Sequence, residues 1–314
     1  MRSLPPEGAL SGFGRPGATD MAAVAQAIAA PKSVSPTIQR FKDALRRHPT
    51  AIAGAIVLLL MMLVAIFAAW LGTIDPQALS PIRRLRPMSD EHWFGTDMLG
   101  RDVYSRVIYG TRVSLTVGLA VAVLATTIGL AIGLVTGYVR WLDAVVMRVM
   151  DGLMSIPSVL LAIALISLTR ASLENVIIAI AIAEVPRVVR LVRSLVLTLR
   201  EQPYVEAAIA SGTRLPAILM RHILPNTLAP LLVQATYIWA SAMITEAILS
   251  FIGAGTPPNI PSWGNIMAEA RSLIQVAPTI LLFPGIFLSL TVLSVNLLGD
   301  GLRDALDPRL ARRM

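Results

Sequence analysis

Residues 203–225 read PYVEAAIASGTRLPAILMRHILP, a stretch of mixed polarity that lies between two long apolar blocks. Its apolar residues recur at the spacing typical of one face of a helix. Pro203 suits the start of a helix, Gly212 suits its end at a positive φ, and Pro225 is expected to close a second short helix. Helices this short are marginal alone in water, so something else is expected to hold this pair.

The composition indicates an integral membrane protein. The chain has 314 residues, of which 55% are hydrophobic and 15% are charged, whereas soluble domains contain about a quarter charged residues. The net charge is +8, but the basic residues gather at the ends of apolar blocks. That distribution signals membrane topology rather than nucleic-acid binding. Because cysteine is absent and the three histidines share no ligand spacing, we expect neither a disulfide nor a metal site.

Six apolar blocks are predicted to span the bilayer as helices, because each is about 20 residues long or more. They are residues 51–71, 113–138, 144–168, 175–197, 227–252 and 279–298. Gly129 and Gly133 in the second span form a small-xxx-small pair, which lets helices approach closely. Pro157 is expected to kink the third span. Basic residues before the first block and after the last predict that both termini are cytoplasmic. The sequence thus predicts an all-α membrane protein whose inner connection, residues 200–226, contains the helix pair.

The remaining segments are predicted to have simpler roles. Residues 1–38 are rich in Ala, Pro, Gly and Ser without periodicity, which predicts a disordered tail. Residues 39–112 are expected to hold the first span and an outer, periplasmic connection. Residues 113–300 are expected to form a core of five spans, and residues 301–314 a cytoplasmic tail.

The outer connection contains a polar motif with two glycines. Its members are Gly95, Thr96, Asp97, Gly100, Arg101 and Asp102. We interpret this motif as part of a folded cap on the bilayer surface, with contact to a ligand as the alternative. An amphipathic helix is expected from Asp102 onward.

Two acidic residues, Glu184 and Glu246, lie well inside predicted spans. A carboxylate at that depth is normally paired or functional. Glu184 is expected to pair with Arg187 unless Pro186 disturbs the helix, and Glu246 is expected to be buried against a neighbouring helix or subunit. Arg187, Arg190 and Arg193 recur every third residue and are interpreted as anchors at the inner end of the fourth span rather than as a voltage sensor.

The chain lacks the motifs of catalysis and of ATP binding. It contains no G-x-x-x-x-G-K-[ST] phosphate loop, and its last lysine is Lys42. It also lacks G-x-S-x-G and H-E-x-x-H signatures, and no combination of nucleophile and base is evident. We therefore expect a non-enzymatic protein without a cofactor of its own.

The inner connection resembles the E-A-A loop of bacterial ABC importer permeases. The resemblance rests on Glu206-Ala207-Ala208, then Gly212 after three residues, then Ile223-Leu224-Pro225. His222 stands where that family usually has an apolar residue, and His-Ile-Leu-Pro-Asn is similar to the peptide and nickel branch. Residues 92–109 and 296–309 also resemble that branch, specifically the C-type permease of dipeptide and oligopeptide importers.

This resemblance implies a six-helix type I importer permease in the bacterial inner membrane. The loop would form a coupling helix seated on an ATPase subunit. The implied partners are a homologous B-type permease, two ABC ATPase subunits that bind ATP and Mg, and a periplasmic solute-binding protein. The implied solute is a di- or oligopeptide, with nickel, glutathione or another small solute as alternatives. A secondary transporter or channel, the other class considered, would typically show an internal repeat and midplane ion ligands, and neither is evident.

Overall fold

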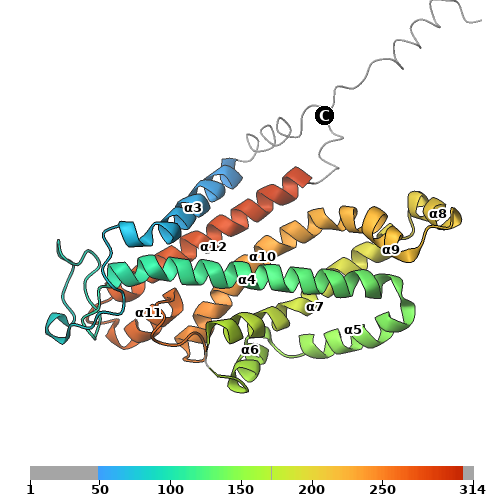
Figure 1. Cartoon of the computed structure of the whole chain (residues 1–314). Helices are drawn as coiled ribbons and strands as arrows, with labels where there is room; N and C mark the ends of the chain where they lie inside the picture. The colour runs from blue at the N-terminus through green and yellow to red at the C-terminus, as the bar shows by residue number, and fades with distance from the viewer. Residues whose placement is uncertain (1–48, 171, 307–314) are drawn as a thin grey trace, which may run out of the picture. The chain divides into compact units, whose positions relative to one another are not determined.

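The computed structural model describes residues 49–170 and 172–306, where the regular structure is helical apart from one bridge between Thr96 and Asp102. This confirms the all-α prediction, and the predicted tail 1–38 lies outside the described residues. The helices shown in Figure 1 are α3 (Pro49–Ile66), α4 (Val103–Tyr138), α5 (Arg140–Met154), α6 (Ser158–Ser167), α7 (Leu173–Leu199), α8 (Pro203–Ala210), α9 (Leu215–Ile218), α10 (Leu224–Phe251), α11 (Trp263–Ala270) and α12 (Thr279–Leu306). Short helical turns cover Ala68–Trp70, Pro81–Arg83, Leu219–Ile223 and Arg271–Leu273.

Four helical stretches in the described part of the chain are long and apolar enough to cross a bilayer. They are α3, α4, the continuous stretch Leu215–Phe251 and α12. The pair α5–α6 would provide a fifth span if its two bent halves cross the membrane together. The remaining predicted span coincides with α7, which has 27 residues and carries two glutamates and three arginines. The structure therefore supports the helical spans, and the count of six stays a prediction.

The third predicted span differs in the structure, and the second lies within a longer helix. The third span is not one kinked helix, because α5 and α6 meet at 91° across the break before Ser158. Pro157 has an extended backbone there and offers no N–H group to continue α5. The second predicted span lies within a helix that begins before residue 113, since α4 starts at Val103 directly after its N-cap, Asp102. The expected amphipathic helix and the second span are thus one helix of 36 residues.

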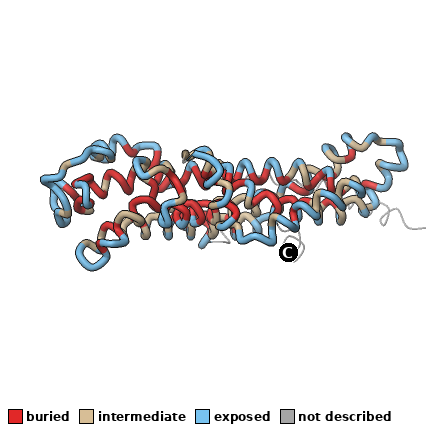
Figure 2. Tube along the Cα trace, turned by 90° about the horizontal axis from the view of Figure 1, so that it is seen from below, coloured by how far each residue is buried: buried red, intermediate tan, exposed pale blue. Residues whose placement is uncertain are grey.

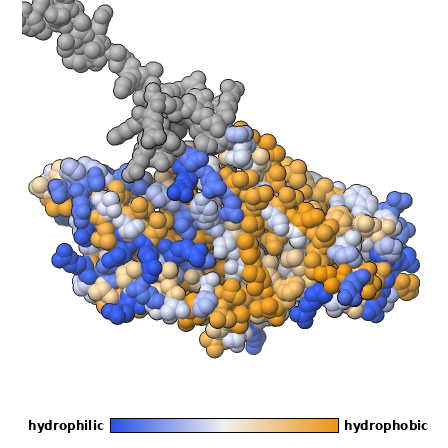
Figure 3. Space-filling model, turned by 180° about the vertical axis from the view of Figure 1, so that it is seen from behind, coloured by the Kyte–Doolittle hydropathy of each residue, from blue (hydrophilic) through white to orange (hydrophobic). Residues whose placement is uncertain are grey.

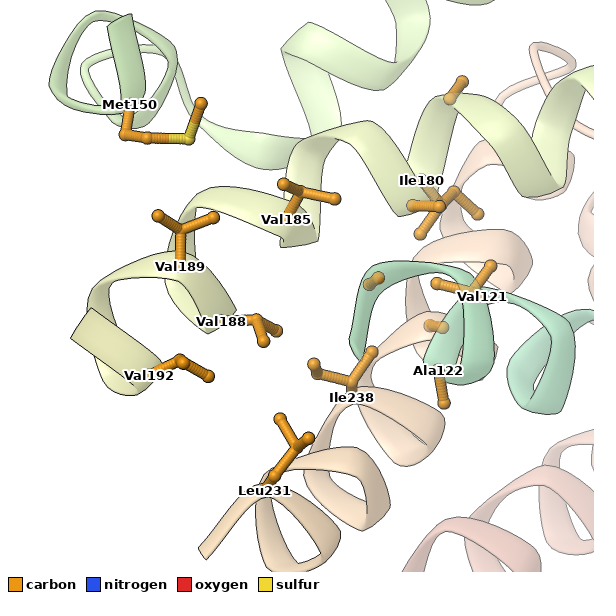
Figure 4. Close-up of a cluster of buried hydrophobic side chains, with 14 of the residues drawn as sticks. Val121, Ala122, Met150, Ile180, Val185, Val188, Val189, Val192, Leu231 and Ile238 are labelled. Carbon is orange, nitrogen blue, oxygen red and sulfur yellow. The ribbon is translucent and has the colours of Figure 1, made fainter. Parts of the chain in front are cut away.

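Glycines bring α4 against α7. A Cβ atom added at Gly129, Gly133 or Gly137 would lie 2.5–2.7 Å from the Cβ atom of a valine on α7. The three valines, one turn apart, are Val188, Val192 and Val196. This contact confirms the prediction that the first two glycines form a small-xxx-small pair. Figure 4 shows the first two valines on the side of α7 toward Leu231 and Ile238 of α10, and all five belong to the largest buried cluster.

The other long pair is α3 with α12, which lie side by side (Figure 1). Gly54 of α3 meets Leu297, and Gly301 of α12 meets Ala51. Figure 2 shows that buried residues lie where helices face one another. Figure 3 shows a broad hydrophobic band on the opposite face of the molecule, and large apolar side chains such as Leu60 and Leu293 are more than half exposed. Such a surface suits the acyl chains of a bilayer.

Candidate coupling site

The first helix of the inner connection, α8, begins and ends where the sequence predicts. Pro203 occupies its first turn, where no N–H group is needed, and Glu206 follows in the same turn. A carboxylate at that end complements the helix dipole. After Ala210, Gly212 donates to Ile209 O at 2.9 Å and Thr213 donates to Ala208 O at 3.0 Å. These two bonds form a Schellman motif, and the φ of Gly212 is +75°, which confirms the predicted positive φ.

The second half of the connection does not end where predicted. α9 continues through the π-helical turn Leu219–Ile223 into α10, so Pro225 lies in the first turn of α10 and closes nothing. In the π turn, Leu224 N–H bonds to Leu219 O, five residues back. A proline crowds the carbonyl four residues earlier, and the wider π turn gives that carbonyl room. The prediction that Pro225 ends the helix is therefore wrong.

One side of this connection is anchored in the core. Val205, Ile218 and Ile223 are buried in the same cluster as the valines of α7. Tyr204 and His222 lie with ring centres 6.4 Å apart, and Asn226 donates to His222 O at 2.7 Å. These contacts explain how a helix pair too short to fold alone is held in place.

The other side of the connection is open and partly apolar. Tyr204, Ile209 and Met220 are 43%, 48% and 62% exposed. Glu206 and Ala207 are also exposed, whereas Ala208 and Leu224 are half-buried. Figure 1 shows α8 at the end of α4 that leads into α5, and α11 at the end where α4 starts. Apolar side chains rimmed by charges at the end of a helix bundle are typical of a protein-binding surface.

The side chains of the outer motif are largely buried rather than exposed on the surface. Thr96, Asp97 and Asp102 are buried, and Arg101 is nearly so. Asp97 Oδ2 accepts a hydrogen bond from Arg101 Nε at 2.6 Å. Gly95 and Gly100 have φ values of +79° and +75° and face backbone carbonyls too closely for a side chain. The folded-cap interpretation is therefore supported, and contact with a ligand stays untested.

Sequence reasoning missed the partners that hold this motif. Arg106, which is 2% exposed, contacts both Asp97 and Glu269 of α11 through Nη1. Arg101 also contacts Glu269. His92 Nδ1 lies 2.9 Å from Asp102 Oδ1, and Asp102 Oδ2 caps α4 by accepting from Ser105 N at 2.7 Å. No sequence signal links Glu269 to Arg106, because 163 positions separate them.

The two acidic residues inside predicted spans have different partners. Glu184 Oε2 lies 3.0 Å from Arg187 Nη1, which confirms the expected pair despite Pro186. Glu246 is buried and accepts a hydrogen bond from Ser250 Oγ at 2.7 Å. It is thus packed within this chain, in line with burial against a neighbouring helix.

Two of the α7 arginines, which the sequence analysis interprets as anchors, also form ion pairs with α5. Arg190 Nη2 lies 2.6 Å from Asp151 Oδ1, and Arg193 Nη2 lies 2.7 Å from Asp143 Oδ2. Both carboxylates belong to α5, so these arginines join two helices. Such pairing explains why α7 tolerates cations along its length.

Comparison with known proteins agrees with this architecture. Residues 125–312 match the family described as "Binding-protein-dependent transport system inner membrane component". Residues 35–87 match the "N-terminal TM domain of oligopeptide transport permease C", which confirms the resemblance to C-type permeases.

Several curated relatives cover most of the chain. A protein of Sinorhizobium fredii named "Probable peptide ABC transporter permease protein y4tQ" is 53% identical over 85% of this chain and 92% of its own length. The "Dipeptide transport system permease protein DppC" of Alkalihalophilus pseudofirmus is 44% identical over 88% and 91%. The "Glutathione transport system permease protein GsiD" of Pectobacterium atrosepticum is 40% identical over 89% and 93%. This chain therefore belongs to the inner-membrane permease components of binding-protein-dependent ABC transport systems.

Proposed function

We propose that this chain is the C-type permease subunit of an importer for di- or oligopeptides, driven through the α8–α9 surface by separate ATPase subunits. One observation carries the proposal: the open surface at Tyr204, Ile209 and Met220 lies on the connection that leads into α10, and Met220 belongs to the helical stretch Leu215–Phe251 that continues into α10. A partner that binds this surface and moves would therefore move the membrane helix α10 with it. The subunit itself performs no ATP chemistry and carries no cofactor or metal.

The residues proposed to contact or shape the ATPase docking site are those of the E-A-A motif. They are Glu206, Ala207, Ala208, Gly212, His222, Ile223, Leu224 and Pro225. Ile223 is buried, so its role is to hold the surface in place, whereas Glu206 and Ala207 are exposed and available for contact. The positive φ of Gly212 allows the chain to turn between α8 and α9.

The complete importer is proposed to contain further subunits. A homologous B-type permease forms the other half of the path, two ATPase subunits bind the inner side, and a periplasmic solute-binding protein delivers the solute. In this arrangement the chain has six spans with both termini in the cytoplasm, and α7 and the α5–α6 pair supply the two spans beyond the four apolar ones. Peptide is favoured as solute by the names of relatives, and glutathione is the second candidate for the same reason.

Variants of the coupling surface test this proposal. We expect Glu206→Lys to abolish uptake while the protein stays in the membrane, because it reverses the charge at the dipole end of α8. Glu201→Lys, an equally exposed change just before α8, is the matched control and should import normally. Gly212→Val should fail because a β-branched residue does not tolerate the φ of +75°, whereas Gly212→Asn should be tolerated.

The measurement is uptake of a panel of dipeptides, longer peptides, glutathione and nickel by cells deleted for this gene and complemented with each variant. Co-purification with the ATPase subunits is measured in parallel. Normal uptake by the Glu206→Lys variant without any bound ATPase would overturn the proposed coupling. Uptake of glutathione or nickel alone would overturn the proposed solute while leaving the coupling intact.

A further inference from the structure

A buried carboxylate lies at the outer end of α10. Glu246 has no exposed surface, and its Oε1 accepts from Ser250 Oγ at 2.7 Å and from Thr256 Oγ1 at 3.3 Å. Thr256 Oγ1 in turn lies 3.2 Å from the hydroxyl of Ser262, the N-cap of α11. The partners of this carboxylate are hydroxyl groups from α10 and from the loop that leads to α11. A line of hydrogen bonds therefore connects the two helices.

The loop between these helices is held equally closely. Asn265 Nδ2 lies within hydrogen-bond distance, 3.0–3.1 Å, of the carbonyl oxygens of Thr256, Pro257 and Ile260, which share its two hydrogens. Gly264 packs on α10 so closely that a Cβ atom there would lie 2.7 Å from Ala247 Cα. These contacts leave no room for α11 to slide on α10 unless the polar cluster breaks.

The far end of α11 is fixed to the outer cap. Glu269 contacts Arg101 and Arg106, and Arg106 also contacts Asp97 at 2.6 Å. The fully buried Trp263 donates from Nε1 to Val107 O at 3.1 Å, which fixes the near end of α11 to α4. α10, α11 and the cap are therefore joined by hydrogen bonds and ion pairs at both ends of α11.

We propose that Glu246 is a positioning residue that makes α10, α11 and the cap of residues 92–106 move as one body with the coupling surface. The inner end of that body is the continuous helical stretch Leu215–Phe251, which begins at the α8–α9 turn. Motion imposed there by an ATPase subunit reaches the outer face through α10 and then through the Glu246 cluster. This inference rests on the proposed coupling function and adds the outer part of the transmission.

The required role of Glu246 is to accept hydrogen bonds. Glutamine keeps the Oε1 acceptor and the side-chain length, whereas alanine removes the acceptor and leaves the hydroxyls of Ser250 and Thr256 without it. We therefore expect uptake by the Glu246→Ala importer to fall by roughly tenfold, because two buried donors lose their partner. The Glu246→Gln importer should transport like the parent. Glu174→Ala, which changes an exposed carboxylate in the first turn of α7, is the matched control.

A distance measurement separates positioning from simple loss of stability. The chain has no cysteine, so spin labels can be attached at Ala268→Cys on α11 and Ile244→Cys on α10 without background. The labelled permease is assembled with its partner permease and ATPase subunits in lipid nanodiscs. The label separation is then measured by pulsed electron paramagnetic resonance with and without ATP.

The proposal expects the same separation with and without ATP in the parent and in the Glu246→Gln importer. In the Glu246→Ala importer the distribution should broaden and shift when ATP binds, while the ATPase subunits stay bound. A separation that changes with ATP in the parent overturns the proposal, and so does a Glu246→Ala importer with parental distances and uptake. Failure of Glu246→Gln to transport would also overturn it, by showing that charge, not hydrogen bonding, is needed. If the parent importer takes up no peptide, only the proposed solute is refuted, because the distance measurement requires ATP and no solute.

Discussion

The contact between α4 and α7 makes the substitution Gly133→Ala a sharp test of the fold. The added Cβ atom would lie 2.7 Å from Val192 Cβ and 3.0 Å from Val189 O. Ordinary contact between such atoms begins at 3.4 Å. The two helices must therefore separate locally, because the backbone fixes the positions of both Val192 Cβ and Val189 O, so neither atom can rotate away.

The size of the effect follows from that separation. A gap on the order of 1 Å forfeits a quarter to a half of the dispersion energy of the atoms it parts. The loss spreads to the neighbouring contacts at Gly129 and Gly137, which depend on the same helix separation. Overpacking of this kind costs about 1–3 kcal/mol, which corresponds to a decrease of roughly 1.5–5 °C in the apparent Tm of a chain of this size.

The assay is the apparent Tm of the purified permease, followed by tryptophan fluorescence. Gly152→Ala in α5 is the matched control, because nothing lies within 4 Å of the position that its added methyl group would take, and its Tm should not fall. Adding Val192→Ala to Gly133→Ala should restore only part of the lost stability, because it removes Val192 Cγ1, which would lie 2.9 Å from the added methyl group, but leaves Val192 Cβ and Val189 O in place. If Gly133→Ala melts like the parent, or if Val192→Ala deepens its defect additively, the close contact between α4 and α7 is refuted.

Two further predictions concern the outer cap. Arg106→Gln should destabilise the permease by about 3–5 kcal/mol and lower its abundance in membranes, because it removes the positive charge beside the carboxylates of Asp97 and Glu269. The control is Arg83→Gln, which removes an exposed ion pair with Glu91 at 3.8 Å and should cost less than about 1 kcal/mol. Gly100→Ala should be far more damaging than Gly72→Ala in a protease-resistance assay: both glycines have positive φ, but a methyl group at residue 100 would lie 1.8 Å from Ser80 O, whereas nothing lies within 4 Å at residue 72. Equal resistance of the two variants would contradict the folded cap.

Local features of the fold could be predicted from the sequence because they depend on neighbouring residues. Glycine readily adopts a positive φ at the end of a helix, so the end of α8 at Gly212 and its positive φ were predictable. The repeated glycines of α4 likewise indicated a close helix contact, although not that α7 provides it. Pro157 signalled a disturbance, but its angle of 91° depends on tertiary packing that the sequence pattern does not contain.

A wrong prediction arose where a residue type is compatible with two different local structures. Pro225 is compatible with both the end of one helix and the first turn of the next, and the π turn before it decided the outcome. The ion-pair partners of Arg190 and Arg193 were not predicted, for a different reason. Their carboxylates lie 39 and 50 positions away on α5, beyond the reach of spacing rules.

The two ends of α10 show why the sequence revealed one functional surface more readily than the other. At its inner end, α10 continues from a connection that leaves Ile209 and Met220 exposed, and an exposed apolar residue in a polar stretch is visible in the sequence. At its outer end, Glu246 is hidden, and its hydroxyl partners, Ser250, Thr256 and Ser262, are ordinary residues until the loop folds back. A docking surface must stay exposed to bind its partner, whereas a buried polar cluster holds two helices together only when its polar groups form hydrogen bonds with one another. In the proposed importer, the same long helix would therefore present a recognisable motif to its ATPase partner, while its transmission to the outer cap would depend on contacts that only the fold creates.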